Sequence, residues 1–70
     1  MPHISVKMYP GRDEKAKKEL AEKLHAVAVE ELGCPEGIVS VSVEDVEKEK
    51  WNEEVIETID EKDMLVKPNY

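Results

Sequence analysis

The first segment of the chain alternates between apolar and polar residues. Over residues 3–9, Ile4, Val6 and Met8 fall on one side, and the other four residues fall on the opposite side: His3, Ser5, Lys7 and Tyr9. A period of two residues is typical of a strand with one buried face. Pro10-Gly11 then ends this strand, because proline donates no hydrogen bond to a sheet and glycine permits the turn.

The apolar period lengthens to that of a helix over residues 13–32. The apolar positions form a single stripe, made of Ala16, Leu20, Leu24, Val27, Ala28 and Leu32. Asp13 offers a side-chain oxygen that caps the start of this helix, and Gly33 ends it. His25 falls on the polar side of the helix, where we expect it to be exposed to solvent.

Alternation returns over residues 38–46, where Val39, Val41 and Val43 face one way and polar residues face the other. A strand, a long helix and a second strand form a β-α-β unit, whose right-handed crossover makes the two strands parallel. Because each strand has only one apolar face, one layer of helix suffices to cover the sheet. The sequence therefore predicts an α+β fold with two layers.

The last third of the chain is less regular. Val55, Ile56 and Ile59 lie at helical spacing within residues 51–60, which predicts a short helix. Residues 64–66 are apolar and fit either a short strand or a packing tail. Because the composition does not shift abruptly anywhere, we expect residues 1–70 to form one domain.

The chain is short for a domain that folds alone. It has 70 residues, and a globule of this size buries only about 60% of the surface that its unfolded chain exposes. The single cysteine, Cys34, allows no internal disulfide, and the two histidines give no recognisable metal-ligand spacing. We therefore expect no metal site, and a homodimer whose subunits join their sheets edge to edge into four strands.

Charge and hydropathy argue against two classes of partner. The net charge of −7 is the opposite of what a nucleic-acid binder needs, and the lysines are interleaved with glutamates. No apolar run approaches the roughly 18 residues of a membrane-spanning helix, and the first residues lack the pattern of a signal peptide. We expect a cytoplasmic protein with no nucleic-acid partner and no membrane partner.

Pro2 is the first candidate for chemistry. It follows the initiator Met1, and removal of that methionine leaves a proline with a free secondary amine. Partial burial or a nearby cation lowers the pKa of such an amine toward neutrality, so that it can act as a general base. The alternative interpretation is an inert proline at the second position.

Arg12 and Trp51 are two further candidates. Arg12 is the only arginine in the chain, and a guanidinium holds a carboxylate through two parallel hydrogen bonds. The alternative for Arg12 is a surface ion pair with Asp13 or Glu14. Trp51 either forms the apolar wall of a substrate pocket or packs in the core or against a second subunit.

In their order and spacing these residues resemble the 4-oxalocrotonate tautomerase family, small β-α-β enzymes of the tautomerase/MIF-like type. The resemblance covers nearly the whole chain. It is carried by Met1-Pro2-His3-Ile4-Ser5-Val6-Lys7, by Pro10-Gly11-Arg12, by Val39-Ser40-Val41-Ser42-Val43 and by Trp51. The ending Val66-Lys67-Pro68-Asn69-Tyr70 is similar to the tail of the dimeric, PptA-like branch of the family.

The resemblance implies a cofactor-independent isomerase, a keto–enol tautomerase that converts 2-hydroxy-2-enoic acids to 2-keto acids. It makes Pro2 the general base and Arg12 the group that binds the carboxylate, while Trp51 lines the pocket. Ser40 occupies a substrate-binding position, where the hexameric members that process muconate-type dienols carry a second arginine. With one arginine, the chain is expected to prefer a small unsaturated monocarboxylic acid and to form a dimer rather than a hexamer.

Two other functions stay open. The same amino-terminal base would serve hydration, dehalogenation or decarboxylation of an unsaturated acid. A small acidic dimer would also serve as a non-catalytic interaction module in which Pro2 is incidental. The state of the amino terminus separates the catalytic functions from the non-catalytic one, because a retained Met1 turns the Pro2 nitrogen into an amide with no basic lone pair.

Overall fold

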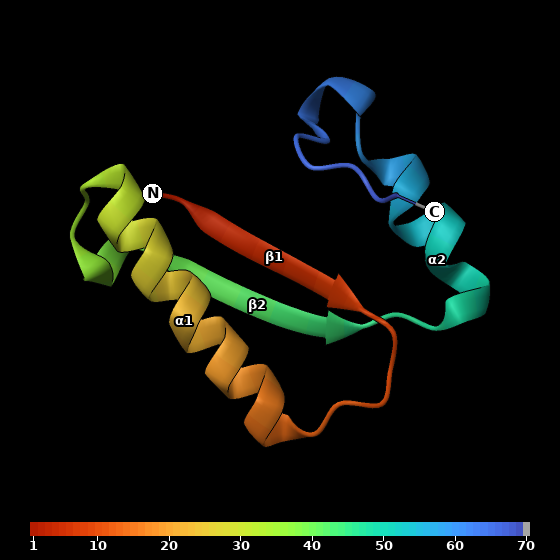
Figure 1. Ribbon diagram of the computed structural model, residues 1–70, viewed down its shortest axis with the longest axis horizontal. Helices are drawn as coiled ribbons and strands as arrows, with labels where there is room; N and C mark the ends of the chain where they lie inside the picture. Colours follow the sequence, from red (N-terminus) through yellow and green to blue (C-terminus); the bar gives the residue numbers. More distant parts are fainter. Residues whose placement is uncertain (70) are drawn as a thin grey trace.

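The framework of the protein, which a computed structural model describes for residues 1–69, is a β-α-β unit (Figure 1). The strands β1 (His3–Met8) and β2 (Ser40–Asp45) are parallel neighbours, and α1 (Glu14–Leu32) connects them. The register pairs His3 with Ser40 at one end and Met8 with Asp45 at the other. These elements confirm the predicted α+β fold of two layers.

Both ends of α1 are fixed by the residues that the sequence indicates. Asp13 Oδ1 accepts a hydrogen bond from the backbone N–H of Ala16 at 2.9 Å, which satisfies one of the free donors at the start of the helix. Gly33 adopts the left-handed conformation with a φ of 62°. Its N–H donates to the carbonyl of Val29 at 3.0 Å and so closes the last turn.

The side of α1 that faces the sheet is rotated relative to the predicted apolar stripe. The half-buried residues of the helix are Lys17, Ala21, Leu24, His25, Ala28 and Val29. Leu20, Val27 and Leu32 of the predicted stripe are instead 36%, 55% and 62% exposed. The helix therefore carries an apolar surface that the single chain does not cover.

An ion pair fastens the start of α1 to the end of β2. Lys17 Nζ lies 3.1 Å from Oδ1 of Asp45 and 3.7 Å from Oε1 of Glu14. The hydrogen bond to Asp45 is the main cause that raises the pKa of Lys17, and desolvation of the ammonium opposes it in part.

The chain after β2 forms a series of short turns rather than one helix. They are the 3₁₀ turn Lys48–Lys50, α2 (Trp51–Glu54), and the 3₁₀ turns Ile56–Thr58 and Glu61–Asp63. The helix predicted over residues 51–60 breaks at Val55, whose φ of −120° and ψ of −65° depart from helical values. Residues 64–66 form no strand in the described chain, and Leu65 and Val66 are each 88% exposed.

The buried core is small. Among residues 1–69 it consists of Val39, Val46 and Val55, which keep 7%, 4% and 7% of their surface exposed. Val39 and Val46 flank β2, and Val55 ends α2. No helix within residues 1–69 combines the length and the apolar character that crossing a membrane requires.

Candidate active site

The predicted site residues lie at the two ends of β1. Pro2 precedes the strand, and its carbonyl accepts a hydrogen bond from the backbone N–H of Ser40 at 3.2 Å. Arg12 follows the strand, in the loop that leads to α1. At roughly 3.3 Å per residue, the strand of 6 residues separates these ends by about 16 Å. Figure 1 shows the amino terminus and this loop at opposite ends of the sheet.

One chain therefore holds two half-sites rather than one site. Pro2 is grouped with Ser40, and Arg12 is grouped with Trp51. The structure does not bring Pro2 and Arg12 together within the chain.

Arg12 and Trp51 share a hollow of about 340 Å³, whose other lining residues are Lys7, Met8 and Tyr9. The rings of Tyr9 and Trp51 meet edge to face, with centroids 4.9 Å apart and an interplanar angle of 85°. Such a contact fixes the orientation of the indole. The sequence pattern predicts for Tyr9 only a place on a strand face, because its contact with Trp51 joins two segments that are distant in the chain.

Arg12 is exposed, and among residues 1–69 it forms no ion pair. The two acidic neighbours that would neutralise it have other partners. Asp13 caps α1, and Glu14 lies 3.7 Å from Lys17. The guanidinium thus keeps its hydrogen-bond donors available for an anion from outside the described chain.

The Pro2 half-site contains a contact that the sequence pattern does not predict. His3 Nδ1 lies 2.7 Å from Oγ of Ser40, and His3 Nε2 lies 3.1 Å from Oγ of Ser42. The three side chains share the face of the sheet turned away from α1, because odd positions of β1 and even positions of β2 point that way. The alternation of apolar and polar residues predicts that these side chains lie on one face, but only the strand register shows that His3 lies beside Ser40 and Ser42.

The same face of the sheet leads from the middle of β1 toward α2. A cleft of about 410 Å³ is lined there by Ser5, Lys7, Trp51, Val55, Thr58 and Ile59. Lys7 Nζ lies 3.9 Å from Oε1 of Glu44 and donates to the carbonyl of Glu54 at 3.4 Å. This cleft and the Arg12 hollow share Lys7 and Trp51, so they are neighbouring parts of one surface.

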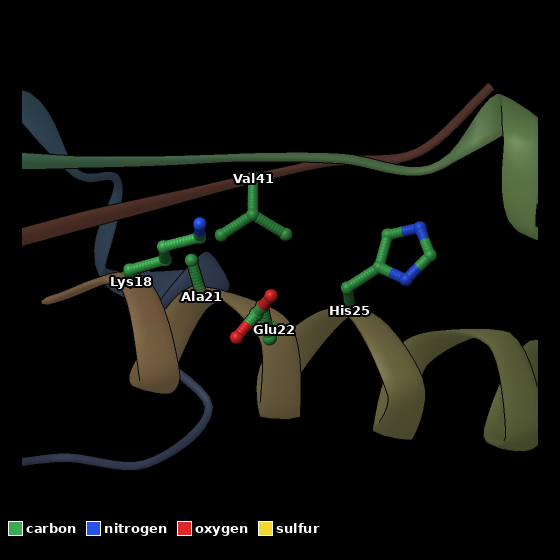
Figure 2. A pocket seen from close by; sticks show the side chains of 5 residues that line it. All are labelled: Lys18, Ala21, Glu22, His25 and Val41. Atoms are coloured by element: carbon green, nitrogen blue, oxygen red, sulfur yellow. The ribbon is translucent and has the colours of Figure 1, made fainter. Parts of the chain in front are cut away.

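A further hollow lies on the opposite face of the sheet, between α1 and β2. It has a volume of about 300 Å³, and Figure 2 shows its lining residues, Lys18, Ala21, Glu22 and His25 of α1 across from Val41 of β2. His25 is half-buried, and its Nε2–H donates to the carbonyl of Glu36 at 2.9 Å. The expectation that His25 is exposed is therefore wrong, because the helix is rotated toward this side. None of the predicted site residues lines this hollow.

The chain is similar over most of its length to known tautomerases. Residues 2–57 match the family model described as tautomerase enzyme. A probable tautomerase of Xylella fastidiosa (strain 9a5c) is 43% identical over 74 residues, which cover 100% of this chain and 89% of the relative. The 2-hydroxymuconate tautomerase of Comamonas testosteroni is 41% identical over 51 residues, which cover 73% of this chain and 81% of the relative.

The fold agrees with this similarity. The crystal structure of TomN, a 4-oxalocrotonate tautomerase homologue in the tomaymycin biosynthetic pathway, has a TM-score of 0.67 and 40% identity, and the match covers 71% of this chain and 77% of TomN. The small β-α-β fold is thus that of a tautomerase. The chain belongs to the tautomerase family, and it is an isomerase that acts on a small molecule.

Proposed function

We propose that the protein converts 2-hydroxy-2-enoic acids to 2-keto acids, with the amine of Pro2 as general base and Arg12 as the group that binds the carboxylate. The observation that carries this proposal is the state of Arg12. It is the only arginine, it has no ion-pair partner among residues 1–69, and it lines a hollow walled by Trp51. These are the properties of an anion-binding group beside an apolar surface.

The two half-sites complete each other if two copies pair through β1. In a sheet of two strands β1 has one edge unpaired within the chain. Antiparallel pairing of two β1 strands about a two-fold axis would place the Pro2 end of one copy beside the Arg12 end of the other. The proposed site is therefore composite, with Pro2 from one subunit and Arg12 and Trp51 from its partner.

The uncovered side of α1 supports a second copy in this place. At about 100° per residue, Leu20 and Val27 project from the side of α1 opposite Lys18. Lys18 lines the hollow against Val41, whereas Leu20 and Val27 are 36% and 55% exposed. A second helix packed on that side would bury this apolar surface and add to the small core.

The proposed reaction moves one proton and leaves the heavy-atom skeleton intact. The neutral amine of Pro2 takes the proton of the 2-hydroxyl group, and the electron pair of the O–H bond forms the C2=O double bond of the ketone. The π electron pair of the C2=C3 double bond moves onto carbon 3 at the same time, which leaves a C2–C3 single bond. The resulting ammonium returns a proton to carbon 3, which gives the 2-keto acid. Arg12 holds the carboxylate and stabilises the negative charge that develops on the enolate oxygen.

The proposal is tested with Pro2→Ala in protein whose amino terminus has been verified by intact mass. Loss of a positioned base is expected to lower kcat/KM for phenylenolpyruvate ketonisation, followed by ultraviolet absorbance, by a factor of about 100. Pro68→Ala, near the other end of the chain, is the matched control and should keep wild-type activity. Unchanged kinetics in Pro2→Ala, or full activity in protein that retains Met1, would remove Pro2 from the mechanism.

A further inference from the structure

The imidazole of His3, the residue that follows Pro2, is held between two hydroxyl groups. Its Nδ1 lies 2.7 Å from Oγ of Ser40, and its Nε2 lies 3.1 Å from Oγ of Ser42. A hydroxyl donates or accepts as its partner requires, so this pair of serines accommodates both the neutral and the protonated ring. When both ring nitrogens donate, each serine keeps its own O–H free to donate to a ligand.

The protein does not neutralise a positive charge at His3. Among residues 1–69 no carboxylate lies within ion-pair distance of the ring. The charged side chains on the same face are Lys7 of β1 and Glu44 of β2, which lie 3.9 Å from each other. The partners of His3 on β2, Ser40 and Ser42, are uncharged. Pro2, whose amine becomes free on loss of Met1, precedes His3 in the sequence.

We infer that His3, held by Ser40 and Ser42, is a specificity-determining residue that binds the second carboxylate of a dicarboxylate enol when its ring is protonated. This inference rests on the proposed function, in which Arg12 holds the first carboxylate. Arg12 is the only arginine, so a second carboxylate needs another donor. In the composite site, His3 is the cationic donor on the Pro2 side.

The inference makes substrate preference depend on pH. Acidic pH favours the protonated form of an imidazole, whereas the carboxylates of the substrate stay ionised in mildly acidic solution. The preference for a dicarboxylate over a monocarboxylate should therefore rise as the pH falls. The titration of Pro2 affects both substrates alike, so it cancels in the ratio of their kcat/KM values.

The experiment measures kcat/KM for 2-hydroxymuconate and for phenylenolpyruvate between pH 5.5 and 8.5, on protein without Met1. The wild-type ratio should increase about tenfold toward the acid end, as expected for gain of one charge-assisted hydrogen bond. His3→Asn keeps a hydrogen-bonding side chain but no titratable charge, so its ratio should stay flat. His25→Asn is the matched control, because His25 is the other histidine and donates to the carbonyl of Glu36 on the far face.

Each outcome decides between a role in specificity and a structural role. A histidine that only ties β1 to β2 would lower the melting temperature in His3→Asn and reduce both activities equally, which would overturn the inference. A flat wild-type ratio, or a wild-type pH dependence in His3→Asn, would also overturn it. The double variant Ser40→Ala/Ser42→Ala, which keeps His3 but releases the ring, should reduce the acid rise and provides the test if His3→Asn does not fold. Absence of activity on both substrates would instead refute the proposed function.

Discussion

Arg12 is free to bind an anion because its acidic neighbours in the sequence have other partners. The carboxylate of Asp13 accepts a backbone N–H at the start of α1, and Glu14 is drawn toward Lys17. An exposed arginine normally finds an acidic neighbour at little net gain in free energy. Here the local structure occupies both acidic neighbours, so the guanidinium stays free to bind a carboxylate from substrate.

Removing the guanidinium should weaken catalysis more than it weakens the fold. For Arg12→Ala we expect kcat/KM on phenylenolpyruvate to fall about 100-fold, the loss of a bidentate charged contact in a partly desolvated site. Arg12→Lys should recover only part of that loss, because an ammonium keeps the charge without the planar fork. Steady-state kinetics measure both effects.

The matched control for Arg12 is Lys15→Ala, which removes an exposed cation three positions further along the chain. It should leave kcat/KM near the wild-type value, since general attraction of an anion by a surface charge is screened by salt. Equal losses in the two variants would show that Arg12 contributes only to the electrostatic field of the surface.

At the scale of elements, the sequence predicts where α1 begins and ends better than it predicts which side of the helix is buried. Asp13 and Gly33 specify the bounds of α1 through hydrogen bonds made within a few residues, so the sequence alone indicates them. The rotation of α1 depends instead on Lys17 reaching Asp45 and on His25 reaching Glu36, which are contacts across the fold. The pattern assigns His25 to solvent because it weighs polarity and not tertiary partners.

The features of the candidate site also differ in whether the sequence alone predicts them. Pro2, Arg12 and Trp51 are visible from residue type and position, because an amino-terminal proline, a lone arginine and a lone tryptophan stand out from the composition. The contacts of His3 with Ser40 and Ser42 require the strand register, which pairs residues 37 and 39 positions apart. No spacing rule within one segment reports such a pairing.

The Lys17–Asp45 contact should stabilise the packing of α1 on β2 in a manner that depends on pH. Folding raises the pKa of Lys17 above its ordinary value of 10.5. The stabilisation is therefore complete below that value and is lost as the pH rises through the higher pKa of the folded protein. We expect Lys17→Met, which keeps the apolar stem, to have a lower Tm than the wild type at pH 7.

Thermal unfolding by circular dichroism between pH 7 and 11 checks this expectation. The difference in Tm between the wild type and Lys17→Met should shrink toward the alkaline end. Lys18→Met provides the control, because Lys18 is the adjacent lysine and has no ion pair among residues 1–69. A Tm difference that persists unchanged at pH 11 would show that it does not arise from the charge of Lys17.

At the scale of the whole molecule, both the small core and the divided site leave a single chain incomplete. Three valines form the buried core of residues 1–69, and Leu20, Val27 and Leu32 are left exposed. The same chain has the proposed base and the proposed carboxylate-binding arginine at opposite ends of a strand of 6 residues. A second copy that pairs along β1 would complete the core and the site in one step, so stability and activity should depend on assembly together.

Mixing two inactive variants tests this coupling directly. Pro2→Ala and Arg12→Ala subunits, each inactive alone, are unfolded together, refolded at equal amounts and assayed with phenylenolpyruvate. If each site takes Pro2 from one subunit and Arg12 from its partner, half of the dimers are mixed and each contains one intact site, so about a quarter of wild-type activity returns.

The control is a Pro2→Ala/Arg12→Ala double variant refolded with the wild type, which should also give about a quarter of wild-type activity. In its mixed dimers, each site combines one intact group with one missing group. Here wild-type homodimers contribute that quarter, and mixed dimers contribute none. Failure of the first mixture to regain activity, while mass spectrometry under native conditions shows mixed dimers, would mean that Pro2 and Arg12 do not act across the subunit interface.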